Sequence, residues 1–366
     1  MIISVPKEIK NHEYRAGLTP NSVRELVAAK HEVLIEHKAG DGIGMIDDHY
    51  EAAGAKICSQ ADVFAKGELI VKVKEPQLDE CKLLSSDQTL FAFLHLAADT
   101  AQTRLLQDSK VTAIAYETIN NANNELPILA PMSEVAGKIA VQLGARCLEK
   151  IHGGKGVLLG GVPGVKASEV LVIGGGVVGT NAIRVALGMG ARVTVLDTAA
   201  DKLRQLEGIF GNQLHTVLST QSKLAELLPL MDLVIGSVLV PGAAAPKIVS
   251  KAMVASMSPG SVVIDVAIDQ GGCFATSKAT DFANPTYLYK DIVHACVSNL
   301  PASVPLTSTL ALNNVTLPYV LELAANKSAY KVNPYLANGV NVCLGEITNK
   351  AVALSLGAEY VPLGQR

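Results

Sequence analysis

The sequence predicts an α/β fold with two domains, each built on a mostly parallel sheet. Its 366 residues are enough for two domains of the usual size of about 150 residues each. Hydrophobic residues make up 49% of the chain, which is enough to bury a sizeable core. Short β-branched runs alternate with stretches of helical composition in both halves of the chain. Such alternation is typical of parallel sheets that carry helices on both faces.

The first half of the chain shows this alternation from its start. Thr19 can cap a helix over residues 19–30, and Pro20 fits the first helical turn. Residues 99–108 have helical composition and enough length to cross over between parallel strands. The strands expected here are residues 2–5, 31–36, 68–73, 88–94 and 111–117. The polar stretch 120–125 then interrupts the pattern and marks a candidate domain boundary.

The alternation restarts in the second half. A long helix is expected over residues 133–151, with Ser133 as a possible cap. The strands expected after it are residues 170–173, 193–196, 213–218, 232–238 and 261–268. Beyond Asn299 the sequence is helical over 308–326 and 339–356, and we expect no further strand there.

A glycine pattern follows the first of these strands. Gly174, Gly176 and Gly179 have GxGxxG spacing between an apolar run and a stretch that can form a helix. Gly174 permits a sharp turn, Gly176 lets a pyrophosphate approach the backbone, and Gly179 lets the helix pack against the strand. The phosphates would lie on the N–H groups at the helix N-terminus. With a strand on each side, the pattern predicts a Rossmann dinucleotide-binding domain, although a glycine-rich turn in an ordinary α/β domain is the alternative.

Asp197 ends the next expected strand, within the roughly 20 residues expected for a carboxylate that binds the adenosine ribose. A carboxylate at this place repels a 2′-phosphate. We therefore expect NAD to be preferred over NADP.

Composition excludes several classes of protein. The net charge of −3, with scattered lysines and arginines, leaves no basic face for nucleic acid. Charged residues near the start leave no room for a signal peptide, and glycines break the most apolar window, so we expect no membrane span. The six cysteines show no ligand-like spacing, which predicts reduced thiols of a cytoplasmic protein and no metal site.

Four polar residues lie where a parallel sheet binds its ligands, beyond the carboxyl ends of strands. Lys74, His95 and Asp269 each follow an expected strand, and Arg15 lies in the loop before the first helix. Such residues could bind a carbonyl, exchange a proton and grip a carboxylate. Taken singly, each also has an ordinary explanation as a surface cation, a hydrogen-bonded histidine or a turn-capping aspartate.

Seven sequence blocks carry a resemblance that covers nearly the whole chain. They are KEIKNHEYRAGLTP, VKVKEP, FLHLA, LAPMSEVAG, GGVPGV, VIGSVLVPG and DVAIDQGG, in this order. The chain resembles the bacterial NAD-dependent L-alanine dehydrogenases, whose superfamily includes the nucleotide-binding subunits of transhydrogenases. The resemblance implies reversible oxidative deamination of L-alanine to pyruvate and ammonium, with NAD as the cofactor.

The resemblance also assigns roles to residues. It implies that Arg15 and Lys74 bind the substrate, His95 is the acid/base and Asp269 assists proton transfer. Leu300 stands where the family more often has methionine, a swap that usually costs little. With Leu300, residues Phe93 and Met132 would wall a pocket sized for a methyl group. The implied NAD-binding residues are Ser133, Gly174, Gly176, Val177, Val178, Gly179, Asp197, Lys202, Ser219, Val238, Leu239, Ile268, Asp269, Asn299 and Leu300.

The resemblance implies a discontinuous substrate domain, residues 1–128 with 305–366, around an NAD domain over 129–304. It also implies a homohexamer. The alternatives are a transhydrogenase subunit, a saccharopine-type amino acid dehydrogenase and a nucleotide-binding regulator without catalysis.

Overall fold

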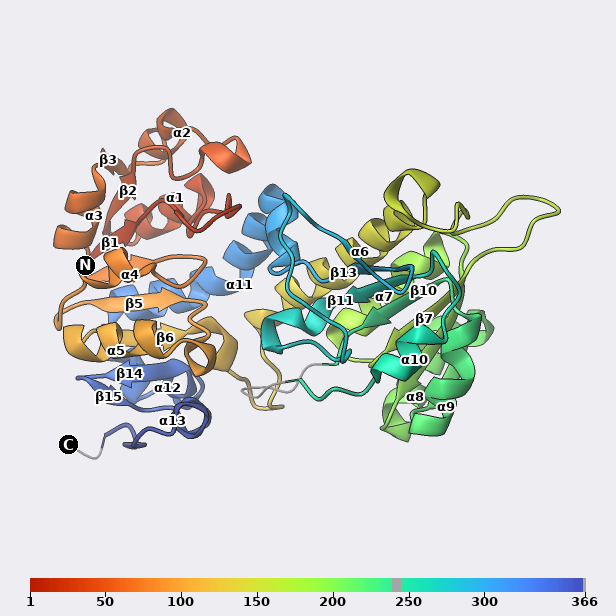
Figure 1. The fold of residues 1–366 in the computed structure, drawn as a ribbon. Coiled ribbons are helices and arrows are strands. Elements are labelled where there is room, and N and C mark those ends of the chain that lie inside the picture. Colours follow the sequence, from red (N-terminus) through yellow and green to blue (C-terminus); the bar gives the residue numbers. More distant parts are fainter. Residues whose placement is uncertain (239–244, 365–366) are drawn as a thin grey trace. The chain divides into compact units, whose positions relative to one another are not determined.

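The computed structural model describes residues 1–238 and 245–364, and the chain divides into two compact units (Figure 1). The first unit comprises Met1–Met132 and Val304–Arg366, and the second comprises Ser133–Ser303. The breaks expected from the sequence lie after residues 128 and 304. Within the described residues, no helix combines the length and the apolar character needed to span a membrane.

The first unit is built on a sheet with strand order β15-β14-β6-β5-β4-β1-β2-β3. Strands β1 to β6 run parallel, whereas β14 pairs antiparallel with β6 and β15. The strands are β1 Ile2–Val5, β2 Glu32–Glu36, β3 Lys56–Cys58, β4 Leu69–Val71, β5 Thr89–Ala92, β6 Thr112–Ala115, β14 Val340–Cys343 and β15 Glu346–Ile347. The helices are α1 Pro20–Ala28, α2 Asp47–Glu51, α3 Gln60–Lys66, α4 Leu78–Cys81, α5 Thr100–Ser109, α11 Pro305–Ala325, α12 Pro334–Gly339 and α13 Lys350–Leu356.

Each face of this sheet has its own core, because successive strand residues point to opposite sides. Leu69 and Val71 of β4 pack with buried residues of α1, α2, α11 and α12. Ile70, between them, packs with buried residues of α3, α4, α5 and α13. Helices therefore cover both faces, as the predicted fold class requires.

The end of the chain differs from the prediction of a helix over residues 339–356. Val340–Cys343 is strand β14, and only Lys350–Leu356 of this stretch is helical beyond Gly339. Leu344 and Gly345 have positive φ values, 53° and 86°, which turn the chain into β15. Pairing with β6, far away in the sequence, decides this structure, and local composition does not report such pairing.

The second unit has the strand order β12-β13-β11-β10-β7-β8-β9 and is parallel except at β12. Counted from β7, its parallel strands stand in the 3-2-1-4-5-6 order of the Rossmann fold. The strands are β7 Glu169–Ile173, β8 Arg192–Asp197, β9 Leu214–Leu218, β10 Leu233–Gly236, β11 Val262–Asp265, β12 Tyr287–Tyr289 and β13 Ile292–Ala295. The helices are α6 Leu129–Cys147, α7 Val177–Gly188, α8 Ala200–Phe210, α9 Gln221–Leu227 and α10 Lys251–Ala255, and the start of α6 up to Met132 belongs to the first unit. The predicted α/β class with two mostly parallel sheets is confirmed.

Helix α6 differs from its predicted limits at both ends. It begins at Leu129, so Ser133 lies inside the helix and does not cap it, and it ends at Cys147 instead of residue 151. Pro131 falls in the first turn, where a helix tolerates proline because the first N–H groups have no helical partner.

Strand β11 ends earlier than predicted, at Asp265 instead of residue 268. The Asp265 carboxylate accepts the backbone N–H groups of Ala267 at 3.1 Å and Cys273 at 2.9 Å. These bonds fold the next residues into the 3-10 helix Val266–Gln270, which carries Asp269.

Candidate functional site

Three of the predicted site residues lie at one edge of the first unit. Arg15, Lys74 and His95 follow β1, β4 and β5, which are neighbours in the sheet, so their carboxyl ends meet at the same edge. Arg15 and Lys74 are only 2% and 6% exposed, so neither is the solvated surface cation of the alternative interpretation. His95 is exposed.

Arg15 is held by a neighbouring carboxylate. Its Nε and Nη2 each donate to a different oxygen of Glu13 at 2.6 Å, the two-bonded geometry that suits a guanidinium and a carboxylate. Its Nη1 lies 3.2 Å from the sulfur of Met132. The guanidinium is therefore fixed in orientation by Glu13.

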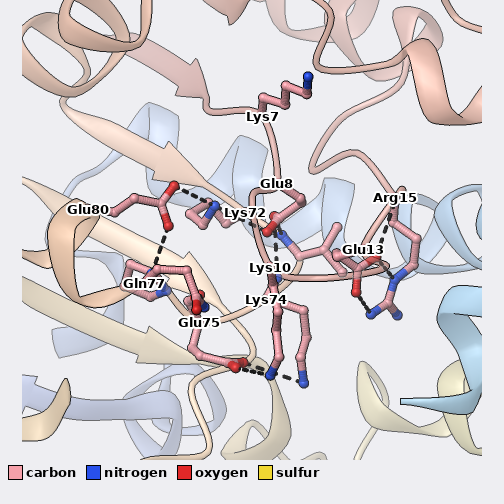
Figure 2. A network of polar contacts seen from close by, with 12 residues as sticks. Lys7, Glu8, Lys10, Glu13, Arg15, Lys72, Lys74, Glu75, Gln77 and Glu80 are labelled. Carbon is pink, nitrogen blue, oxygen red and sulfur yellow. Dashed lines mark hydrogen bonds and ion pairs between the residues drawn. The ribbon is translucent and has the colours of Figure 1, made fainter. Parts of the chain in front are cut away.

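Lys74 shares a carboxylate with Lys10, as Figure 2 shows. The Lys74 Nζ lies 3.4 Å from Glu75 Oε2, while Lys10 pairs with the other oxygen. Burial would raise the pKa of Glu75, but the charges of Lys74 and Lys10 outweigh it and lower the pKa to about 2. Glu75 is therefore ionised at neutral pH.

A second buried charge cluster supports the backbone beneath Lys74 (Figure 2). Lys72 is fully buried, and its Nζ lies 3.1 Å from Glu8 and 3.2 Å from Glu80. Burial opposes the charge of Lys72, yet the two carboxylates outweigh burial and raise its pKa. Glu8 also accepts the N–H of Val73 at 2.7 Å and that of Lys74 at 3.3 Å, which fixes the end of this chain segment.

His95 stands among positive charges. Its ring stacks on Phe93, with 5.9 Å between ring centroids and 8° between ring planes. Desolvation by the surrounding protein and the charges of Lys74, Lys10 and Arg15 lower the pKa of His95 well below its ordinary value. The ring is neutral at pH 7 and can accept a proton.

Sequence reasoning missed the carboxylates that support the site: Glu8, Glu13, Glu75 and Glu80, which pair with cations, and Glu117, which accepts backbone N–H groups. Glu8, Glu13 and Glu75 stand inside the same short blocks as the predicted cations, so proximity along the chain was an available signal. Glu117 follows β6, the strand beside β5, and accepts the N–H of His95 at 2.7 Å. No local pattern points to that contact.

In the second unit, the glycine pattern forms the turn between β7 and α7. Gly174 has φ +99°, a conformation that other residues rarely adopt. A Cβ on Gly179 would come within 1.9 Å of the Gly174 carbonyl oxygen, so this close packing requires glycine. A Cβ on Gly176 would meet nothing within 4 Å, which leaves open space beside the N-terminus of α7. The turn therefore offers the kind of cradle that a pyrophosphate fits.

Asp197 ties this turn to the end of β8. Its carboxylate accepts the N–H of Gly175 at 2.7 Å and that of Ala199 at 2.9 Å. A cavity of about 310 Å³ opens beside the same helix. It is lined by Glu134, Lys138, Gly176, Val177, Thr180, Asn181, Arg184 and Lys202, which include three of the predicted NAD-binding residues.

The remaining predicted NAD-binding residues are spread over the second unit. Ser219 follows β9 and donates its N–H to the Asp197 carbonyl at 2.8 Å. The exposed Asp269 accepts the N–H of Asn299 at 3.4 Å, and Asn299 has φ +60°. Leu300 is buried in the core, which contains residues of α6 and β13. Val178 and Ile268 are buried, Ser133 and Val238 are half-buried, and Leu239 lies outside the described residues.

The predicted methyl pocket has members in both units. Phe93 and Met132 are buried in the first unit, where Phe93 meets the ring of Tyr116 edge-on at 5.1 Å. Leu300 belongs to the second unit.

A Rossmann strand order with a glycine turn, joined to a second α/β unit with a cationic strand edge, is typical of nucleotide-dependent oxidoreductases. The chain belongs to the alanine dehydrogenase/PNT family. The N-terminal domain of that family matches residues 4–136, and the C-terminal domain matches residues 140–350.

Individual relatives agree with this assignment. The chain is 53% identical to an alanine dehydrogenase of Halomonas elongata over 99% of its own length and 98% of that protein. A solved L-alanine dehydrogenase superposes with a TM-score of 0.94 at 47% identity, covering 98% of this chain and 99% of that one. A transhydrogenase from Sinorhizobium meliloti superposes with a TM-score of 0.82 over 96% of this chain and all of its own. At 22% identity, that last likeness shows the fold alone.

Proposed function

We propose that this protein is an NAD-dependent alanine dehydrogenase. The reaction converts L-alanine, NAD⁺ and water to pyruvate, ammonium, NADH and a proton, and it is reversible. The single observation that carries the proposal is identity of 53% to an alanine dehydrogenase over 99% of the chain. The charged edge of the first unit provides the chemistry that this substrate needs.

Arg15 and Lys74 bind the substrate carboxylate in this proposal. Both are buried cations whose positions are set by acidic neighbours, so they present fixed positive charge at the strand edge. A fixed cation in a site with little water attracts a carboxylate more strongly than a mobile surface cation does.

His95 exchanges the protons. Its lowered pKa keeps the ring neutral at pH 7, so it can take a proton from the water that attacks the imino carbon. The protonated ring can then return that proton as the carbinolamine releases ammonia.

The second unit fits the cofactor. The open space at Gly176 and the N–H groups at the start of α7 would hold the pyrophosphate, and Asp197 would face the adenosine ribose. NAD⁺, when bound, supplies the acceptor for the hydride that leaves the substrate Cα.

The test is NAD⁺ reduction with a panel of L-amino acids that includes alanine, glycine, serine, lysine and glutamate. Alanine should give the highest kcat/KM. No alanine-dependent NADH formation, or a clear preference for a larger amino acid, would overturn the proposal.

Self-association as a homohexamer is part of the proposal and is supported by family membership. Analytical ultracentrifugation should give a mass of six chains, and a monomer at micromolar concentration would contradict it. A cytoplasmic location stays a prediction from the sequence.

A further inference from the structure

We propose that Glu117 is a positioning residue that clamps the backbone of His95 and thereby aims its ring. This inference rests on the proposed function, in which His95 exchanges protons. Glu117 acts through His95 and needs no contact with the substrate.

The backbone N–H groups of Leu94 and His95 need hydrogen-bond acceptors that the sheet does not provide. Phe93, just beyond β5, still donates its N–H to the carbonyl of Val73 at 3.0 Å. The N–H groups of Leu94 and His95 come after this last sheet contact. Every backbone N–H needs an acceptor, and for these two it has to come from outside the strands.

Glu117 is that acceptor for both residues. His95 donates to Oε1 at 2.7 Å, and Leu94 donates to Oε1 at 3.3 Å and Oε2 at 3.2 Å. One carboxylate from the segment that follows β6 therefore receives two successive backbone donors. Burial raises the pKa of Glu117, while the N–H groups of His95 and Leu94 and the charge of Lys74 oppose that rise.

The hydrogen bonds to Glu117 hold His95 in an unfavourable backbone conformation. Its φ is +51° and its ψ is +35°, in the left-handed region that residues other than glycine seldom occupy. On the other side, the His95 carbonyl accepts the N–H of Ala98 at 3.1 Å, so the residue is tied at both ends. Local strain of this kind persists only where the surroundings impose it.

Glu117 is itself anchored. It lies in the 3-10 helix Tyr116–Thr118, directly after β6. The fully buried Tyr116 packs edge-on against Phe91 at 4.4 Å and against Phe93 at 5.1 Å. These aromatic contacts fix the segment that contains Glu117 against β5 and the residues that follow it. Phe93 also stacks on the His95 ring.

The experiment compares Glu117→Gln and Glu117→Ala with Glu32→Gln, a control that loses only a surface ion pair with Lys56. Glu117→Gln keeps the shape of the side chain and one acceptor oxygen, whereas Glu117→Ala keeps neither. We expect kcat to fall roughly 100-fold in Glu117→Ala, as for a catalytic group displaced by about 1 Å, and to fall less in Glu117→Gln. The pyruvate KM and the NADH Kd should stay within about threefold of the wild type, since catalytic geometry and not binding is lost.

Hydrogen–deuterium exchange of the full-length protein separates a local clamp from a general structural role. In both Glu117 variants the peptide with Leu94 and His95 should exchange faster, while the rest of the first unit keeps its wild-type rate. A kcat within threefold of the wild type in Glu117→Ala would overturn the proposal. Faster exchange throughout the first unit in Glu117→Gln would overturn it as well.

The failure of the proposed function gives a different result. In that case the wild type would show no alanine-dependent NAD⁺ reduction, and the exchange measurement would still test the clamp.

Discussion

The two sheets share one architecture and differ in what their carboxyl edges present. In the first unit, β1, β4 and β5 are followed by Arg15, Lys74 and His95, which are charged or titratable side chains. In the second unit, β7 is followed by a glycine turn that presents backbone N–H groups and empty space. Side chains at the first edge suit proton exchange and carboxylate binding, and bare backbone at the second suits phosphate. The residues after a strand decide the chemistry at this edge, whereas the sheet decides only where they stand.

Carboxylates also play different parts at the two edges. In the first unit they hold cations, as Glu13 holds Arg15 and Glu75 holds Lys74. In the second unit Asp197 and Asp265 bind backbone N–H groups and shape turns. Mutations at the first edge should therefore change catalysis most, and mutations at the second should change cofactor binding or folding.

The largest effect should come from His95→Ala. Loss of the proton-exchanging ring should lower kcat by at least about 1,000-fold, within the range known for general acid–base groups. NADH binding, measured by NADH fluorescence, should be nearly unchanged because the cofactor site belongs to the other unit. Substantial residual turnover would remove His95 from this role.

A matched glycine pair tests the second edge. Gly176→Ala adds a methyl group to open space, so the protein should fold normally while its NADH Kd rises about tenfold or more. Gly179→Ala places a methyl group 1.9 Å from the Gly174 carbonyl oxygen, which should destabilise the second unit by about 1–3 kcal/mol, as overpacking does. Thermal unfolding and fluorescence titration distinguish the two outcomes, and equal behaviour of both variants would contradict the assigned turn.

Asp197 should set the choice of cofactor. The wild type should use NAD at least about 100-fold better than NADP, because the carboxylate repels a 2′-phosphate. Asp197→Asn keeps an acceptor for the turn and removes the charge, so this ratio should fall. Similar kcat/KM values for the two cofactors in the wild type would contradict this role.

A smaller, pH-dependent effect is expected at Glu75. Its pKa in the folded protein is about 2, below the ordinary carboxyl value, so the ionised form stabilises the fold above about pH 4.5. This stabilisation, on the order of 3 kcal/mol, is lost as the pH falls from about 4.5 to 2. Urea unfolding should show Glu75→Gln less stable than the wild type at pH 6, and the difference should shrink toward pH 3. A difference that stays constant with pH would show that the charge of Glu75 does not matter.

The sequence was sufficient for most of the alternating strands, the glycine turn and the positions of Arg15, Lys74 and His95, because these depend on local periodicity and on strand ends. It did not predict the short strands β3, β12 and β13. It failed at β14, whose partner β6 lies far away in the chain. It also failed at Glu117, because its contact with His95 joins the segments that follow two neighbouring strands and has no local signature. Helix α6 began early because a proline in the first turn is compatible with a helix.

The buried Lys72 has a consequence for how this edge forms. Its ammonium is fully enclosed, so desolvating it is unfavourable until Glu8 and Glu80 are both in place. Glu8 comes from the segment after β1 and Glu80 from α4, so the cluster can assemble only when distant parts of the first unit have docked. Folding of this region is therefore cooperative, and Lys74, the second residue after Lys72, reaches its final place only in the completed unit.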